Sequence, residues 1–478
     1  MSSEIIGKPL NRRQFLRLAT AALGGAMLAA CAPAAAPTQA PAAPTPAPAE
    51  ATQAPAAEAT KAPEVTAAPA QKEPYTISMW THDKLYVDFF TFRGETWAKE
   101  DPTAQNYDVK FDFQQIPYND VFTKVLANLA AGSGAPDMVG IEISAFSRFM
   151  KGSIADKGLV DLTEWIGDER KKFVEGRWTP YMINGKIYGV ESALCPVGYW
   201  YQPDPFDKAG ITLPFKTWDD FLAAGKQLAA EKKAMAPVDD TSNGIFMELF
   251  QQRGGLCFQE DGTVTLNTPE AVDVLQFLVD GANKDQVFMK MGSEFWGAGT
   301  ISAYKDGSLV GAIMPDWYLD ATLKAQLADM KGQWRLTTMP TWSAGGHTTS
   351  TWGGTGFAIT KQSKHADLVW SLLHYTYMTK ESQVLRFQKI HYFPTMIEAM
   401  NDPGVVDLAD DYCGGQKVGA VFASVAQDIP VQWQSAYWNE AMTEMSNQIT
   451  AAFSGELTPE EAIKKADENI KAIVAKGE

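Results

Sequence analysis

Residues 119–141 read NDVFTKVLANLAAGSGAPDMVGI, and this stretch sets the fold class. Asn119 is a predicted N-cap, because the apolar residues that follow it recur on one helical face. Gly132 is expected to end that helix. Residues 136–141 then predict a buried strand. Alternation of strand and helix is typical of a mostly parallel sheet that helices cover on both sides.

The same alternation continues along the chain. Further strands are predicted at residues 75–80, 109–113, 309–314 and 356–359. Thr217 is predicted to form a capping box with Asp220, and Thr-Pro pairs at 268–269 and 458–459 predict two more helix starts. Without its first 72 residues the chain retains 478 − 72 = 406 residues, more than the roughly 250–300 that one core supports. We therefore expect an α/β protein with two doubly wound lobes.

The first 72 residues are predicted to be an export signal followed by a tether. A basic leader with Arg12 and Arg13 precedes an apolar run at 18–30, which is too short to cross a membrane that needs about 20 residues. This leader, which ends at Cys31, resembles a twin-arginine signal joined to a lipoprotein processing box. The resemblance implies that residues 1–31 direct export and that lipid on Cys31 anchors the protein at the extracytoplasmic face of a bacterial cell membrane.

An ordinary cleaved signal peptide, in which Cys31 has no role, is the alternative for this leader. Residues 32–72 are rich in Pro and Ala, hold no aromatic residue, and are predicted to form a disordered tether because they have too little apolar surface to fold.

Net charge and cysteine spacing narrow the classes of partner. The formal net charge of −16 disfavours nucleic acid and anionic lipid. Beyond Cys31 the chain has three cysteines, which lack the spacing of a zinc or redox site: Cys195, Cys257 and Cys413. We expect no metal and no cofactor. At most one disulfide can form among the three, and the sequence leaves open whether Cys257 and Cys413 pair.

A set of short blocks spans the chain beyond the tether. They are AAGSGAPD at 130–137, NGKIYGV at 184–190, FDKAGI at 206–211, TWDDF at 217–221, KDGS at 305–308, PDW at 315–317, GGTGFAI at 353–359 and TPEEA at 458–462. In this order they resemble the extracellular solute-binding proteins of ABC importers (family 1), in the branch of maltose-binding-protein-like sugar-binding lipoproteins.

This resemblance implies two α/β lobes joined by a hinge of several segments. Residues 73–192 and 346–390 would form lobe 1, and residues 193–345 and 391–478 would form lobe 2. It further implies a monomer that captures a mono- or oligosaccharide between closing lobes and delivers it unchanged to the permease subunits of an ABC transporter.

Aromatic residues are expected in the cleft between the lobes, because their rings cover the C–H faces of a sugar. Trp317 and Trp438 match stacking tryptophans of the sugar-binding relatives. Trp296, Trp352 and Tyr392 are further candidates. Two other tryptophans, Trp165 and Trp218, are predicted to lie in the core.

Polar candidates stand at positions where the resemblance places hydroxyl-binding groups. Polar side chains are expected where strands end, at the carboxyl edge of an open α/β sheet. These candidates are His82, Asp83, Glu142, Ser144, Asp316, Gly353 and Gly354. Cys195 falls where the matched relatives use a carboxylate, which is a departure from the maltose-type pattern.

An exported glycoside hydrolase is the main alternative of another class, but the chain lacks Gly-x-Ser-x-Gly, His-Glu-x-x-His, Walker and Cys-x-x-Cys motifs. We therefore expect no enzyme and assign no catalytic residue. Among binding proteins, other ligand classes are a polyol phosphate, a peptide, a polyamine or ferric ion. No candidate cleft residue is Arg, which disfavours an anion, and iron would require clustered tyrosines. A neutral carbohydrate is the predicted ligand.

Overall fold

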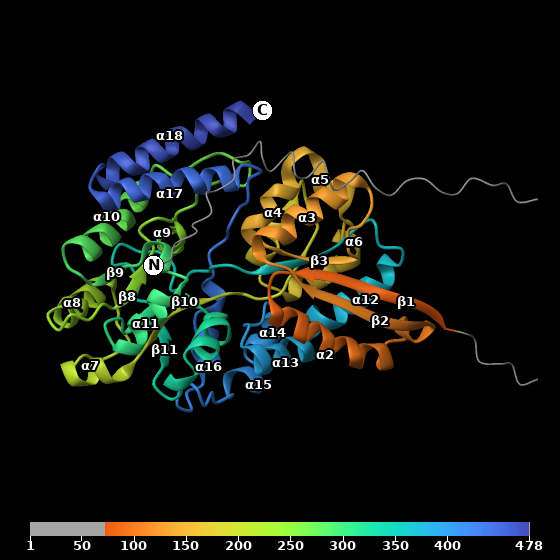
Figure 1. The fold of residues 1–478 in the computed structure, drawn as a ribbon, viewed down its shortest axis with the longest axis horizontal. Coiled ribbons are helices and arrows are strands. Elements are labelled where there is room, and N and C mark those ends of the chain that lie inside the picture. The colour runs from red at the N-terminus through yellow and green to blue at the C-terminus, as the bar shows by residue number, and fades with distance from the viewer. Residues whose placement is uncertain (1–71, 478) are drawn as a thin grey trace, which may run out of the picture. The chain divides into compact units, whose positions relative to one another are not determined.

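A five-stranded sheet forms the centre of the first lobe (Figure 1). Its strands, in spatial order, are β2 (Tyr107–Gln115), β1 (Glu73–Thr81), β3 (Met138–Glu142), β12 (Thr355–Ile359) and β6 (Val190–Glu191). β1 pairs in parallel with β3 and with β2, where Glu73 lies opposite Tyr107 and Thr81 opposite Gln115. β12 runs antiparallel to β3 and β6. The sheet is therefore parallel at β2, β1 and β3 and antiparallel beyond them.

The structure is a computed structural model that describes residues 72–477. The predictions for the export signal, for Cys31 and for the tether up to residue 71 lie outside the described residues. Within residues 72–477, no helix combines the length and the apolar character that crossing a membrane requires.

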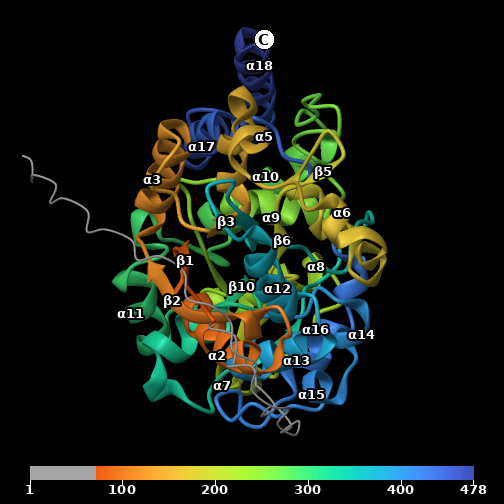
Figure 2. The same cartoon turned by 90° about the vertical axis from the view of Figure 1, so that its right-hand side faces the viewer.

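Helices cover both faces of the five-stranded sheet. α2 (Lys84–Glu100) and α12 (Ala366–Tyr377) pack on one face, and α3 (Tyr118–Ala131) and α4 (Ile143–Met150) pack on the other (Figures 1 and 2). Neighbouring residues of a strand enter opposite cores: Met138 and Phe357 pack with α2 and α12, whereas Val139 and Ala358 pack with α3 and α4. This alternation with a period of two buries both faces.

The second lobe contains a three-stranded antiparallel sheet and a two-stranded parallel sheet. β7 (Val197–Tyr201) lies between β10 (Gly311–Pro315) and β11 (Arg335–Thr338), and β8 (Ala236–Val238) pairs with β9 (Phe288–Lys290). The helices around them are α7 (Pro203–Ala209), α8 (Trp218–Ala229), α9 (Gly244–Gln252), α10 (Pro269–Asn283), α11 (Ala298–Asp306), α16 (Val418–Ala423), α17 (Trp438–Ser454) and α18 (Pro459–Gly477). β7 pairs antiparallel with both of its neighbours.

Shorter helices complete the two lobes. They are α5 (Ile154–Gly158), α6 (Thr163–Ile166), α13 (Lys380–Ile390), α14 (Ile397–Met400) and α15 (Pro403–Val406). A hairpin of β4 (Met182–Ile183) and β5 (Lys186–Ile187) precedes β6.

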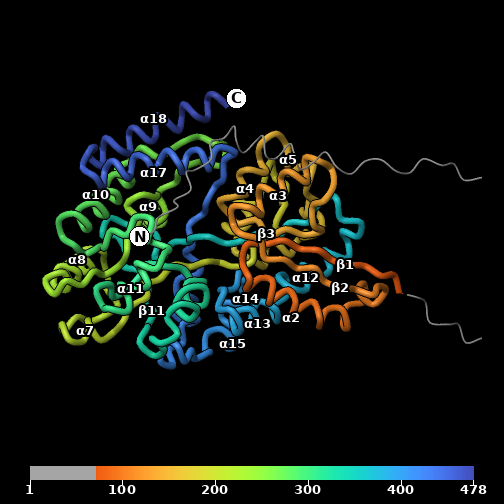
Figure 3. The backbone as a smooth tube through the Cα atoms, viewed as in Figure 1, coloured from red at the N-terminus to blue at the C-terminus, as the bar shows by residue number. Residues whose placement is uncertain are grey.

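Several segments cross between the lobes. Pro196 pairs antiparallel with Thr351, and the amide of Val197 donates to the carbonyl oxygen of Ser350 at 3.1 Å. Figure 3 shows the corresponding yellow and teal segments running from one lobe to the other. A third segment joins them, because the amide of Leu194 donates to the carbonyl oxygen of Phe393 at 3.0 Å.

This third segment packs on both cores. Tyr392, Met396 and Ala399 belong to the core of the first lobe, whereas Phe387 and Phe393 belong to that of the second. The chain around residue 390 therefore contacts both cores.

Most of the helix starts and ends predicted from the sequence are confirmed. Gly132 ends α3 in the left-handed conformation at φ 73°, and Thr217 and Asp220 form the predicted capping box. The prediction for Asn119 is wrong, because α3 begins at Tyr118 with Pro117 at the N-cap. The fixed φ of proline, here −50°, turns the chain into the helix two residues earlier.

Of the two tryptophans predicted to lie in the core, Trp165 and Trp218, one does so. Trp218 is buried as predicted, at 2% exposure. Trp165 is 38% exposed and not part of the core; its ring packs against that of Trp370, with centroids 5.6 Å apart. All three cysteines of residues 72–477 are free and buried, so Cys257 and Cys413 do not pair.

Candidate ligand-binding site

A cleft of about 1080 Å³ lies between residues of the two lobes. Its wall includes the ends of β1 and β3 in the first lobe, and α9, α17 and the segment after β10 in the second. All the site residues predicted from the sequence line it, except Asp316 and Cys195. Those in the lining are His82, Asp83, Glu142, Ser144, Trp296, Trp317, Trp352, Gly353, Gly354, Tyr392 and Trp438.

Three tryptophans form one wall of the cleft. The ring centroids of Trp296 and Trp317 are 6.1 Å apart, with their planes at 35°, and those of Trp296 and Trp352 are 5.5 Å apart, with their planes at 64°. Nε1 of Trp317 donates to the carbonyl oxygen of Trp352 at 2.9 Å, which fixes one indole relative to the other. Trp296 is 54% exposed, so its ring is accessible to a ligand.

Two glycines hold the turn that carries Trp352. Gly353 and Gly354 have φ of 80° and 119°, which residues with a side chain rarely adopt. A Cβ on Gly354 would also lie 2.2 Å from Nη2 of Arg177. That guanidinium donates to the carbonyl oxygen of Gly353 at 2.9 Å and to Glu191 at 3.0 Å. A buried ion pair thus supports the backbone behind the tryptophan wall.

His82 and Asp83 follow the end of β1 and face the cleft. Asp83 caps α2 by accepting a hydrogen bond from the amide of Leu85 at 2.9 Å, and its second oxygen accepts from the hydroxyl of Tyr392. Burial lowers the pKa of His82, although the charge of Asp83 opposes this shift. The imidazole is therefore neutral at pH 7 and can both donate and accept.

Glu142 and Ser144 occupy the equivalent place after β3. The Glu142 carboxylate caps α4 by accepting from the amide of Ser144 at 2.8 Å, and it also accepts from the hydroxyl of Tyr118 at 2.9 Å. Burial raises the pKa of Glu142 above its usual value, although these hydrogen bonds oppose the shift. Capping thus places both carboxylates, those of Asp83 and Glu142, at the cleft.

Asp316 and Cys195 lie behind the cleft wall. Asp316 is fully buried and accepts hydrogen bonds from the amides of Trp317 and Phe393. Burial raises its pKa to about 7. Asp316 thus orients Trp317 and does not face the cleft itself. Cys195 is 1% exposed and packs in the core of the first lobe, where its backbone is left-handed at φ 54°.

Trp438 serves both the cleft and the core. It begins α17, is only 6% exposed, and packs against Phe258 with ring centroids 6.0 Å apart. Most of its indole is therefore enclosed by the core of the second lobe.

Several lining residues were not predicted from the sequence. They are mainly polar or methionine side chains from α9, α17 and neighbouring segments: Gln115, Tyr118, Asn243, Met247, Glu248, Gln251, Asp320, Gln432, Asn439 and Met442. A signal was present in residues 244–251, where Gly244, Met247, Glu248 and Gln251 recur at helical spacing. Only the packing of α9 shows that this stripe faces the cleft.

Acidic side chains outnumber basic ones in the cleft lining. The described lining contains four acidic residues, Asp83, Glu142, Glu248 and Asp320. It contains one lysine, Lys84, and no arginine. In residues 72–477, no group of three or more His, Cys, Asp or Glu side chains is arranged to hold a metal ion. The wall thus combines exposed indole rings with carboxyl and amide groups.

Comparison with known proteins places this geometry in a family. The family model for bacterial extracellular solute-binding proteins matches residues 97–411. The chain is 27% identical over 403 residues to the arabinooligosaccharide-binding protein of Bacillus subtilis (strain 168), which covers 83% of this chain and 92% of that protein. It is 25% identical over 383 residues to the lactose-binding protein of Rhizobium radiobacter, covering 78% of this chain and 87% of the relative.

Solved structures share the fold. The binding protein associated with an ABC transporter from B. animalis subsp. lactis Bl-04, in complex with β-1,6-galactobiose, superposes with a TM-score of 0.68 at 22% identity and covers 84% of this chain and 97% of that one. Maltose-bound MalE3 of T. maritima gives a TM-score of 0.66 at 19% identity and covers 83% of this chain and 99% of that one. The match of the family model, together with the two α/β lobes and the cleft between them, shows that the chain belongs to the bacterial extracellular solute-binding protein family.

Proposed function

We propose that the cleft binds a carbohydrate, and specifically a short oligosaccharide. The observation that carries this proposal is the tryptophan wall of Trp296, Trp317 and Trp352, which faces a cleft rich in carboxyl and amide groups. Indole faces suit the C–H faces of sugar rings, and the polar groups suit the hydroxyls around the rims. The relatives named for arabinooligosaccharide and lactose support the same ligand class.

The size of the cleft favours more than one sugar unit. Its volume of about 1080 Å³ lies just above the range of roughly 300–1,000 Å³ for small-molecule sites. A monosaccharide would leave much of the tryptophan wall in contact with water.

The charge of the cleft argues against an anionic ligand such as a polyol phosphate. Four carboxyl-bearing side chains and one lysine are among the described lining residues. Recognition of a phosphate usually requires arginine or lysine, and Lys84 is the one basic side chain of that kind among these residues. An acidic cleft is compatible with a neutral sugar and with a polyamine, so the experiment must separate these two.

A thermal-shift panel on the purified protein tests the proposal. The panel contains arabinotriose, lactose, β-1,6-galactobiose and maltose, with spermidine, a tripeptide and glycerol phosphate as the competing classes. We expect one or more sugars to raise the Tm, because a ligand at 100 times its Kd stabilises the folded state by about 2.7 kcal/mol. A rise with spermidine or the peptide alone would overturn the carbohydrate proposal.

We further propose that the protein acts as the anchored receptor of an importer. Lipid on Cys31 would hold it at the extracytoplasmic face, and permease subunits would accept the sugar without any change to its bonds. Residues 73–192 with 346–390, and residues 193–345 with 391–478, would move as the two lobes of a monomer. A Cys31→Ser variant that stays on washed membranes would contradict the anchor, and hydrolysis of a bound sugar would contradict the absence of catalysis.

A further inference from the structure

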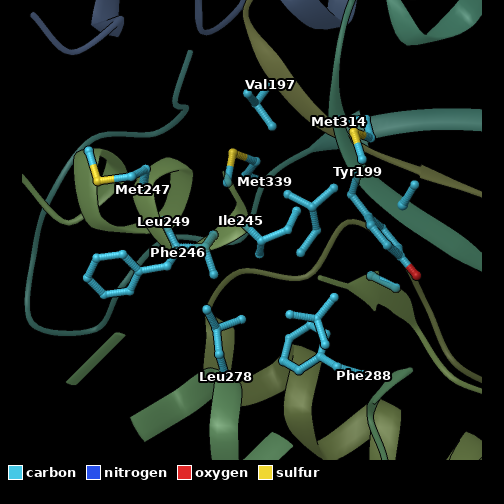
Figure 4. Close-up of a cluster of buried hydrophobic side chains, with 14 of the residues drawn as sticks. Val197, Tyr199, Ile245, Phe246, Met247, Leu249, Leu278, Phe288, Met314 and Met339 are labelled. Carbon is cyan, nitrogen blue, oxygen red and sulfur yellow. The ribbon is translucent and has the colours of Figure 1, made fainter. Parts of the chain in front are cut away.

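Helix α9 has two different buried faces. Ile245, Phe246 and Leu249 pack into the core of the second lobe beside Leu278 and Phe288, as Figure 4 shows. On the other face, a stripe lines the cleft: Gly244, Met247, Glu248 and Gln251. The core contacts hold the helix in place, so the stripe is a fixed part of the cleft wall.

Trp352 packs closely against the start of this stripe. A Cβ on Gly244 would lie 2.6 Å from Cζ2 of Trp352. The stripe therefore continues from the tryptophan wall, and it leads from Trp352 toward Glu248 and Gln251.

Glu248 and Gln251 hold polar atoms that nothing in the described chain satisfies. Glu248 is 1% exposed, and both of its carboxyl oxygens lack a hydrogen-bond partner among residues 72–477. Oε1 of Gln251, a residue 5% exposed, likewise has none within that range. Burial without partners is unfavourable for a carboxyl group.

The next buried polar residue of the same helix shows the ordinary arrangement. Gln252 accepts from Nε1 of Trp218 at 2.8 Å and donates to the carbonyl oxygen of Pro340 at 2.7 Å. It is fully buried and does not belong to the cleft lining. The polar atoms of α9 that lack hydrogen-bond partners thus belong to the helix face that borders the cleft.

Building on the carbohydrate function proposed above, we propose that Glu248 and Gln251 form a specificity-determining pair that binds hydroxyl groups of the oligosaccharide at the α9 end of the cleft. The ligand supplies the partners that the protein lacks, after a side-chain rotation that brings the buried oxygens to the cleft surface. A sugar without a hydroxyl at this position leaves the pair unsatisfied and is discriminated against.

The protonation state of Glu248 fits a hydroxyl better than a cation. Burial raises the pKa of Glu248 well above its usual value, which favours the neutral, protonated carboxyl group. A neutral carboxyl group has one donor and an acceptor, as has the amide of Gln251. A sugar hydroxyl, which both donates and accepts, matches both groups.

The test compares Glu248→Met, Glu248→Gln and the matched control Gln252→Met. Calorimetry with arabinotriose gives Kd, and a thermal melt without ligand gives Tm. We expect Glu248→Met to raise the Tm, because it removes an unsatisfied buried group, and to weaken binding roughly 10- to 100-fold. Glu248→Gln should keep Kd within about 3-fold, since an amide also donates and accepts. Gln252→Met should lower the Tm and leave the Kd of the folded protein unchanged.

Different results overturn different claims. An unchanged Kd for Glu248→Met shows that the carboxyl group only fills space, and this ends the inference while the carbohydrate function stands. Equal losses for Glu248→Gln and Glu248→Met show that a negative charge is required, which also ends it. If Glu248→Met does not fold, monodeoxy analogues of arabinotriose replace it. At least one must bind the unaltered protein more weakly, and by a different factor in Glu248→Gln. If the unaltered protein binds no sugar in the panel, the proposed function itself falls.

Discussion

The tryptophans of the cleft differ in what their burial allows them to do. Trp296 is 54% exposed, whereas Trp438 is 6% exposed and packs in the core of the second lobe. We therefore expect removal of the first indole to affect ligand binding and removal of the second to leave a cavity in the core.

We predict that Trp296→Ala weakens oligosaccharide binding roughly 10- to 100-fold and changes the free energy of unfolding by about 0.5 kcal/mol or less. The loss follows from removal of an accessible ring beside Trp317 and Trp352. Trp165→Ala is the matched control, because Trp165 is also partly exposed, at 38%, and does not line the cleft. Calorimetry and thermal melts on both variants check this, and a similar Kd for both would remove Trp296 from the site.

At the scale of elements, helix starts supply the polar groups of the first lobe. Asp83 begins α2 and Glu142 begins α4, each by accepting a hydrogen bond from a backbone amide of the first turn. Because both helices follow strands of one sheet, their N-caps meet at the same edge. Each carboxyl group thus satisfies a helix N-terminus and lies at the cleft.

A group of four charged side chains forms a network of ion pairs that includes Asp320 of the cleft lining. Nδ1 of His391, after α13, lies 2.7 Å from Asp320, and Nε2 lies 3.1 Å from Asp410. Lys324 lies 3.0 Å from Asp320 and 2.7 Å from Asp410. Burial alone would lower the pKa of His391, but its two carboxylate partners outweigh this and raise it. Burial alone would raise the pKa of Asp320 and Asp410, but His391 and Lys324 outweigh it and lower both.

The pH dependence of stability follows from these directions. A raised pKa means that the His391 contribution is fully present below its unfolded pKa of about 6.5 and is lost as pH rises through the higher folded value. The contributions of the two aspartates are present above their unfolded pKa of about 3.9 and are lost as pH falls through the lower folded values. The stabilising contributions of His391, Asp320 and Asp410 are therefore all present between roughly pH 4 and pH 6.5.

We predict that His391→Asn lowers stability by roughly 2 kcal/mol at pH 5, and by less at pH 9. Asparagine suits this position because it tolerates the left-handed backbone, here at φ 51°. Denaturant melts at the two pH values give the difference. The control is His347→Asn, whose single carboxylate partner Asp428 is 44% exposed, so a small effect is expected. An equal loss at pH 5 and pH 9 for His391→Asn would contradict the charged role of His391.

At the scale of the whole molecule, α4 of the first lobe meets α17 of the second beside the cleft. Nδ2 of Asn439 donates to Oγ of Ser147 at 2.9 Å, and Lys151 forms an ion pair with Glu440. We call these four residues the interlobe contact. The interlobe contact favours the arrangement in which the two lobes lie close together. A ligand held between the lobes would favour the same arrangement, so the contact should strengthen ligand binding.

We predict that the double variant Ser147→Ala, Lys151→Ala binds the oligosaccharide roughly 2- to 5-fold more weakly and leaves Tm without ligand almost unchanged. Small-angle scattering of the ligand-free variant should show a larger radius of gyration. Lys171→Ala is the control, because its ion pair with Asp168 lies within one lobe. A ligand-free variant as compact as the unaltered protein would show that the interlobe contact does not hold the lobes together.

The sequence by itself determined the features that depend on neighbours a few residues apart. The strand and helix alternation, the capping box of Thr217 and the left-handed end at Gly132 all follow from local spacing and backbone preference. Most of the predicted cleft residues stand where strands end or crossovers begin, and the family blocks mark these places in the chain.

Only the tertiary structure decided which distant segments meet. Tyr392 donates to Asp83, 309 positions away, and Asp316 turns inward to the amides of Trp317 and Phe393. Trp165 lies on the surface, and Glu248 borders the cleft on a helix buried on every side. These outcomes depend on how the crossovers bring two cores together, and the spacing of residues within one segment carries no information about the side chains that will lie against it from another.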